Sequence, residues 1–182
     1  MQDLSHSPAP QPEPRPHPPR YSLARFMLSH PLHLVALGFG SGLSRAAPGT
    51  VGTAWAWLAY LVMQLWLTQA QIGIVIAVSL VLGWLACAVT ARNMGVADPG
   101  SIVWDEVVAM WIVLWLAMPM GFWGQLIAFG LFRFFDAAKP GPVKWADRSF
   151  KGFGWRGGFG IMFDDLVAAF CTLLVIAFWR WL

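Results

Sequence analysis

Long apolar stretches alternate with short polar segments along most of the chain after residue 50. Five stretches stand out, at residues 51–67, 72–91, 102–118, 122–135 and 166–179. A helix rises 1.5 Å per residue, so the first two stretches reach about 25 to 30 Å, close to the thickness of a bilayer's hydrocarbon core. The pattern predicts an all-α, polytopic helical membrane protein: a compact bundle of four to five apolar helices with cytoplasmic polar loops.

The segments between neighbouring stretches predict two helical hairpins. Residues 68–71 and 119–121 carry no charge and contain turn-forming residues. Each therefore reads as a tight connection between two antiparallel helices. The arms 102–118 and 122–135 are short for a full crossing, and we expect them either to tilt or to stop inside the bundle.

The N-terminal region differs from the rest of the chain. Residues 1–20 contain seven prolines and almost no apolar side chains, which predicts a disordered tail. Residues 21–39 mix Arg25, His30 and His33 with apolar residues, which is typical of an amphipathic helix lying at the membrane interface. We expect residues 21–182 to form a single membrane-embedded domain.

Composition supports the membrane assignment. The chain is 58% hydrophobic and 12% charged, against about 45–50% and about 25% in soluble domains. Its net charge of +3 comes from basic residues that flank the apolar stretches, where they meet lipid headgroups, so we expect no nucleic-acid partner. Cys87 and Cys171 both lie in apolar stretches, so neither a disulfide framework nor a zinc site is indicated.

The distribution of Lys and Arg predicts the orientation. After residue 50, every charge except Arg180 lies within 92–106 or 133–165. Both segments fall on the same side as the N-terminal tail if the two hairpins cross and return. The positive-inside rule makes that side cytoplasmic.

Two pairs of adjacent carboxylates, Asp105 with Glu106 and Asp164 with Asp165, are the strongest candidates for chemistry. Each pair borders an apolar helix, where an uncompensated charge is expensive. A helix dipole explains one acid at a helix start but not two adjacent acids, whose repulsion calls for a cation between the pairs. Oxygen ligands with no nearby His or Cys favour Mg²⁺.

Other polar residues allow two interpretations. Asp98, before Pro99, either caps the next helix or takes part in catalysis. Arg133, Asp136 and Lys139 recur at three-residue spacing. They form either an ion-pair ladder along one helix, or a set in which Asp136 faces the metal and the two cations face a phosphate.

Glycine-rich segments are open to similar alternatives. Residues 38–42 and 48–52 precede the first apolar stretch, and they serve either close helix packing or an anion cradle of free amides and hydroxyls. The Walker lysine is missing, so a nucleotide P-loop is improbable. Glycines between 152 and 160 form either a flexible loop or backbone room for a headgroup.

Four blocks in fixed order carry a resemblance to a known family. They are GSGLS with PGT at 40–50, DPGSIVWDE at 98–106, FRFFDAAKP at 132–140 and GGFGIMFDD at 157–165. Together they resemble the phosphatidylglycerophosphatase A family over nearly all of the chain after residue 30. The resemblance implies a bacterial inner-membrane phosphatase, dependent on Mg²⁺, that converts phosphatidylglycerophosphate to phosphatidylglycerol and inorganic phosphate.

The resemblance implies a role for each of the candidate residues. Expected metal ligands are Asp105, Glu106, Asp136, Asp164 and Asp165. Expected catalytic residues are Asp105, Glu106, Asp164 and Asp165, one of which acts as base toward a metal-bound water. Expected substrate-binding residues are Arg133, Lys139, Ser41, Thr50 and Arg45.

A divalent-cation transporter or channel that uses the same carboxylates is the alternative. Intramembrane acids would then line the ion pathway. The acids lie at the ends of apolar stretches on one side, not at mid-span, which favours the enzyme.

Overall fold

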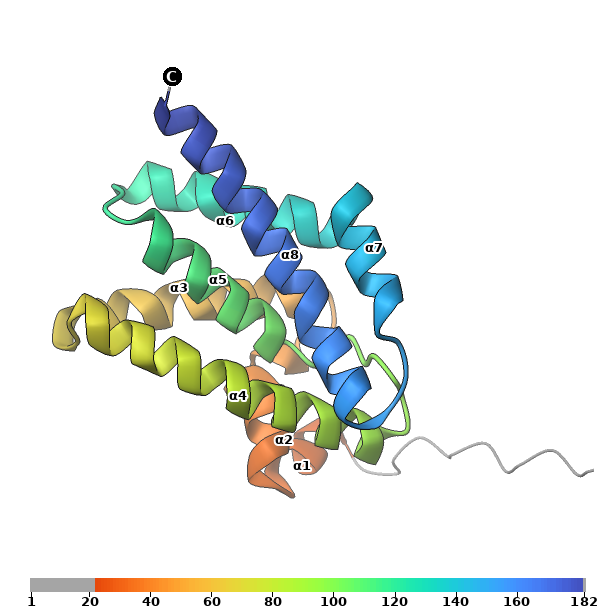
Figure 1. Cartoon of the computed structure of the whole chain (residues 1–182). Helices are drawn as coiled ribbons and strands as arrows, with labels where there is room; N and C mark the ends of the chain where they lie inside the picture. The colour runs from red at the N-terminus through yellow and green to blue at the C-terminus, as the bar shows by residue number, and fades with distance from the viewer. Residues whose placement is uncertain (1–21, 182) are drawn as a thin grey trace, which may run out of the picture.

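The computed structural model describes residues 22–181, and the predicted disordered tail at 1–20 lies outside the described residues. Five long helices form the body of the molecule, as the apolar pattern predicted (Figure 1). They are α3 (Pro48–Trp66), α4 (Gln69–Met94), α5 (Trp104–Ala117), α6 (Phe122–Ala138) and α8 (Gly154–Trp181). The short elements are α1 (Leu23–Leu28), α2 (Pro31–Ala36), the 3₁₀ segment η1 (Gly38–Leu43) and α7 (Gly141–Ser149).

Within the described residues, α4 and α8 are long and apolar enough to cross a membrane. Their lengths of 26 and 28 residues correspond to about 39 and 42 Å of helix. The chain is therefore a helical membrane protein in which the two longest helices carry the clearest spans.

Helix α5 is the centre of the bundle. It packs against α3, α4, α6 and α8, and most of its side chains are fully buried. Its 14 residues span about 21 Å, less than a hydrocarbon core. Its last turn lies beside the C-terminal end of α8, where Arg180 donates to the carbonyls of Ala117 and Pro119.

The two predicted hairpins are present, but the first one opens into a wedge. Thr68 closes the turn between α3 and α4 with a capping box, in which its hydroxyl accepts from the Gln71 amide and the Gln71 side chain accepts from the Thr68 amide. Beyond that turn α3 packs mainly on α5, whereas α4 packs mainly on α8. The arms diverge, and α5 packs against both of them.

The prediction of one interfacial helix over 21–39 is wrong. Pro31 disfavours helical geometry at the residue before it, and His30 is extended, so α1 and α2 are separate. The pair is also anchored to α4: the Asn93 amide donates to Nε2 of His33 at 2.9 Å, and His33 Nδ1 donates to the Phe26 carbonyl at 3.1 Å. With His33 buried, this unit packs on the bundle as part of it.

The last helix begins at Gly154, twelve residues before the predicted start at 166. Three of the glycines that suggested a loop, Gly157, Gly158 and Gly160, are instead close-contact points inside α8. A Cβ on Gly158 would lie 2.8 Å from the backbone nitrogen of Ala88 on α4. Asp164 and Asp165 consequently lie within α8 and not at its start, so the N-terminal dipole does not account for either.

We expect Gly158→Ala to lower the melting temperature of the detergent-solubilised protein. The added methyl forces α4 and α8 apart, and overpacking of this kind costs about 1–3 kcal/mol. Gly130→Ala is the matched control, because a Cβ there meets nothing within 4 Å and alanine favours helix. Equal melting temperatures for the two variants would contradict the close contact.

Candidate functional site

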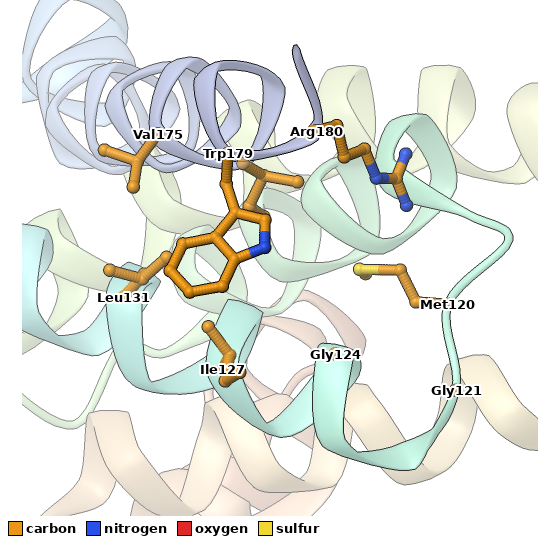
Figure 2. A pocket seen from close by; sticks show the side chains of 9 residues that line it. Met120, Gly121, Gly124, Ile127, Leu131, Val175, Trp179 and Arg180 are labelled. Carbon is orange, nitrogen blue, oxygen red and sulfur yellow. The ribbon is translucent and has the colours of Figure 1, made fainter. Parts of the chain in front are cut away.

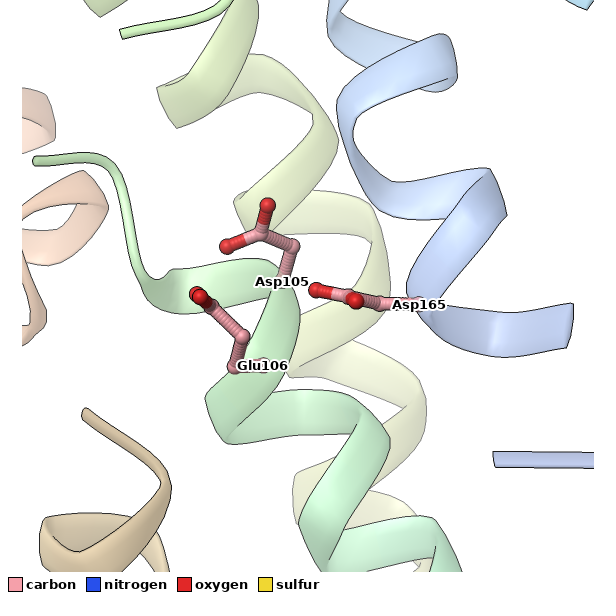
Figure 3. Close-up of side chains that lie close together, drawn as sticks. All are labelled: Asp105, Glu106 and Asp165. Carbon is pink, nitrogen blue, oxygen red and sulfur yellow. The ribbon is translucent and has the colours of Figure 1, made fainter. Parts of the chain in front are cut away.

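Three carboxylates meet at the start of α5. Asp105 and Glu106 occupy its first turn, and Asp165 reaches them from α8 (Figure 3). One oxygen from each lies within 4.8 Å of the others. Asp105 and Asp165 are 9% and 3% exposed, so this carboxylate cluster (Asp105, Glu106 and Asp165) is inside the protein.

Local packing fixes the beginning of α5. Trp104 fills the space left by Gly83 on α4, where a Cβ would lie 2.9 Å from its indole nitrogen. That nitrogen donates to the Ser79 carbonyl at 3.2 Å. The next two side chains, Asp105 and Glu106, therefore project from a start that cannot shift along α4.

Of the two interpretations of Asp98, the one in which it caps this helix is wrong. Val103 is the N-cap residue and makes no side-chain cap bond. Pro99 accepts from the Ile102 amide at 2.9 Å, which closes a turn and leaves the Asp98 side chain exposed before it. Asp98 therefore stands outside the carboxylate cluster.

Several polar atoms at the cluster have no partner. Among the described residues, Asp105 Oδ1 and Glu106 Oε2 are buried without a hydrogen bond. A buried acceptor without a donor costs about 1–3 kcal/mol, and more when charged. The helix dipole of α5 offsets part of this for Asp105 and Glu106 but none for Asp165. Three hard oxygen donors with free lone pairs are the donor set that Mg²⁺ accepts.

Asp136 and Arg133 extend the site from α6. Arg133 forms an ion pair with Asp136, and its Nη1 lies 3.8 Å from Glu106 Oε1. Asp136 is near enough to Glu106 and Asp165 for their charges to interact. The Arg133 Nε is buried without a partner among the residues described. The guanidinium therefore faces the cluster with one N–H donor that has no acceptor.

Gly49 brings the start of α3 against the same group. A Cβ on Gly49 would collide with Glu106 Oε1 and lie 3.2 Å from Arg133 Nη1. The amides of Gly49 and Thr50 precede the first backbone hydrogen bond of α3, from Val51 to Ala47. The Gly49 backbone and the Arg133 guanidinium therefore both lie against Glu106, next to the two free N–H groups that begin α3.

The predicted substrate-binding residues fall in different places. Ser41 is buried, and its hydroxyl donates to the Gly38 carbonyl at 2.8 Å. Thr50 is exposed in the first turn of α3, and Arg45 is exposed just before it. The structure therefore brings Thr50 and Arg133 to the end of α3 that faces the cluster, whereas the Ser41 hydroxyl is already occupied.

Lys139 binds two carboxylates outside the cluster. It ends α6 in a left-handed conformation, and its ammonium donates to Asp147 and to Asp164, at 2.6 Å each. Burial opposes its charge, but the two hydrogen bonds outweigh burial and raise the Lys139 pKa above its ordinary value. Asp164 therefore faces Lys139, while its neighbour Asp165 faces α5.

Asp147 is the member of this site that sequence reasoning missed. Lys151 also pairs with it at 3.1 Å. Burial raises the pKa of Asp147, but the hydrogen bonds from Lys139 and Lys151 prevail and hold that pKa below its ordinary value. Its spacing of four from Lys151 was the available signal, whereas its contact with Lys139 depends on the turn at Pro140.

An apolar cavity lies elsewhere, between α6 and the end of α8. It has a volume of about 340 Å³ and an apolar lining, with Trp179 between the helices and Arg180 at one end (Figure 2). Fifteen residues of α8 separate Arg180 from Asp165, about 22 Å along the helix. This cavity is therefore separate from the carboxylates.

Comparison with known proteins identifies the family. The family model described as phosphatidylglycerophosphatase A matches residues 34–180. The chain is 42% identical to phosphatidylglycerophosphatase A of Escherichia coli over 161 residues, 85% of this chain and 87% of the relative. It is 41% identical to the Haemophilus influenzae protein of the same name over 155 residues, 85% of this chain and 91% of that one. No solved structure matches the chain significantly.

The two relatives align with nearly their whole length, and the matched region contains every residue of the carboxylate cluster together with Arg133 and Gly49. The chain belongs to the phosphatidylglycerophosphatase A family.

Proposed function

We propose that this chain hydrolyses the terminal phosphomonoester of phosphatidylglycerophosphate, releasing inorganic phosphate and phosphatidylglycerol. Family membership supports the reaction and the substrate. The observation that carries the proposal is the buried group of Asp105, Glu106 and Asp165, whose unpartnered oxygens need a cation. A phosphatase of this kind binds a dianionic group, which requires positive charge at a poorly solvated site.

We further propose that Asp105, Glu106 and Asp165 hold Mg²⁺, with Asp136 beside them. When bound, the ion would act as a Lewis acid on a phosphoryl oxygen and lower the pKa of a coordinated water. The donor set fits, because all candidate ligands are carboxylates and two of their oxygens are otherwise unsatisfied. We assign Asp164 to holding Lys139, with which it already pairs.

The chain's own groups account for phosphate binding. The Arg133 guanidinium and the free amides of Gly49 and Thr50 would donate to the phosphate oxygens. These donors are in place before substrate arrives, so no reorganisation is needed as charge develops on the phosphoryl group. The acyl chains of the substrate would remain in the bilayer.

Proton transfer requires one carboxylate as base. As water attacks phosphorus in line, its proton would pass to a carboxylate oxygen of the cluster that does not hold the ion. The P–O bond to the glycerol oxygen breaks, and that oxygen takes the proton back from the carboxylate as phosphatidylglycerol leaves. Hydrolysis is then balanced, with one water consumed for each phosphate released.

We propose that the site faces the cytoplasm from the bacterial inner membrane. The basic residues between 133 and 156 lie on the side of the bundle where α5 begins, and the positive-inside rule places them in the cytoplasm. The transporter alternative gains no support, since both relatives are named as phosphatases and the large cavity is apolar and remote from the acids.

We expect Asp165→Asn to reduce phosphate release from the lipid on the order of 100-fold or more, because it removes a negative charge at the cluster while keeping the side-chain shape. Mg²⁺ should raise the melting temperature of the unmodified protein and should no longer do so for the variant. Asp98→Asn, at an exposed carboxylate outside the cluster, should preserve both responses. Near-normal turnover by Asp165→Asn would refute the metal assignment.

We expect Gly49→Ala to reduce kcat/KM by about 100-fold, since the new methyl would displace Glu106 and Arg133 from their places. The measurement is phosphate release at several substrate concentrations. Gly141→Ala is the control, because a Cβ there meets nothing within 4 Å. If the two variants retained the same activity, the close approach of α3 would not matter for the reaction.

A further inference from the structure

Helix α7 has one face buried and the opposite face exposed, although the Trp145 ring also meets Phe163 of α8 edge to face. Val143 and Ala146 are fully buried, and α7 packs on α8. Lys144, Trp145 and Arg148 point outward on the other face, with Trp145 63% exposed. This short helix is strongly amphipathic, and its outer face is basic and aromatic.

Exposed aromatic and basic side chains continue after α7, through the turn and into the start of α8. Phe153 and Trp155 are 55% and 64% exposed, and Arg156 is exposed beside them. We call the six residues Lys144, Trp145, Arg148, Phe153, Trp155 and Arg156 the basic–aromatic surface. Large exposed aromatic side chains at such density mark a surface that contacts something apolar.

The positive charge of this surface is not neutralised within the described part of the chain. Asp147 is the only acid between residues 137 and 163, and it is already paired with Lys139 and Lys151. None of Lys144, Arg148 and Arg156 forms an ion pair with a described residue, although Arg156 stacks over the Phe150 ring at 5.9 Å. The surface therefore presents three cations to its surroundings.

A contact with α4 places this surface at the level of the membrane. The Trp84 indole, on a candidate spanning helix, donates to the Trp155 carbonyl at 2.6 Å, and the two rings meet edge to face. Trp84 precedes Arg92 by eight residues, about 12 Å along α4. Trp155 therefore lies on the bilayer side of the charged end of α4, next to the interface where tryptophan rings gather.

We propose that the basic–aromatic surface docks on the anionic phospholipid headgroups of the surrounding bilayer. Trp145, Phe153 and Trp155 enter the interface, while the three cations contact lipid phosphates. The pairing of aromatic and basic residues, in a segment whose one acid is the paired Asp147, favours this partner, because such surfaces combine apolar insertion with attraction to anionic lipid. The surface is independent of the reaction proposed above.

A chain of ion pairs connects α7 with the carboxylate cluster. Asp147, on the inner side of α7, joins α7 to Lys139, and Lys139 joins Asp164 on α8. Asp165, the next residue, belongs to the carboxylate cluster. A headgroup-bound α7 therefore holds one end of a chain of ion pairs that ends beside the site.

The test uses the full chain in nanodiscs with an environment-sensitive fluorophore. The label is placed at Gly141→Cys, an exposed position on α7 where a side chain meets nothing within 4 Å, in a background with Cys171→Ala. Cys87 is fully buried and needs no change. We expect emission to shift to shorter wavelength in nanodiscs of anionic lipid relative to zwitterionic lipid, and about 1 M salt to reverse the shift.

Two matched double variants separate surface binding from general charge. Lys144→Gln with Arg148→Gln should abolish the anionic-lipid shift. Arg25→Gln with Arg92→Gln removes the same charge from exposed positions elsewhere and should keep the shift. A label at Val96→Cys, in an exposed loop, should not respond to lipid charge.

Three outcomes would overturn the proposal. Emission that is equal in the two lipids excludes headgroup docking. A shift that survives neutralisation of Lys144 and Arg148 excludes their role as headgroup ligands. A shift that appears only in nanodiscs with two copies of the chain assigns the surface to a protein contact. Because none of the readouts needs turnover, an inactive protein would count against the proposed reaction and leave this test decisive.

Discussion

Three carboxylates lie together inside an apolar bundle, and the rest of this structure has to compensate their negative charge. Charges in a medium of low polarity are costly to bury, and like charges within 5 Å repel one another. The protein answers with positive elements around them: the N-terminus of α5, the Arg133 guanidinium and the start of α3. One oxygen each of Asp105 and Glu106 still lacks a partner, and no described side chain supplies the cation that they require.

Close backbone approach is the means by which these elements reach one another. Gly49 lets α3 touch Glu106, Gly83 lets Trp104 lie against α4, and Gly158 lets α8 lie on Ala88. In a membrane, where apolar burial does not distinguish helix from lipid, such small-residue contacts supply much of the packing between helices. The same glycines therefore position the chemistry and hold the bundle, and a methyl group at any of them would disturb both.

The sequence predicted the long helices well, because apolar length and uncharged turns are direct consequences of the bilayer. It failed where tertiary contact decides. Glycines at 157–160 read as a loop, since nothing in the sequence shows that Gly158 faces the Ala88 backbone. The adjacent pair Asp164 and Asp165 read as one unit, yet neighbouring residues on a helix point about 100° apart, so one meets Lys139 and the other α5. Asp147 was missed because its partner is reached only through the turn at Pro140.

The position of α5 at the centre of the bundle has a consequence for biosynthesis. Glu106 leaves the ribosome 27 residues before Arg133 and 59 residues before Asp165. The insertion machinery therefore handles an acidic helix first, then receives its counter-charge on α6, and only later the helix that completes the group. Chain order thus supplies Arg133, which lies beside Glu106, before Asp165 adds the third carboxylate of the cluster.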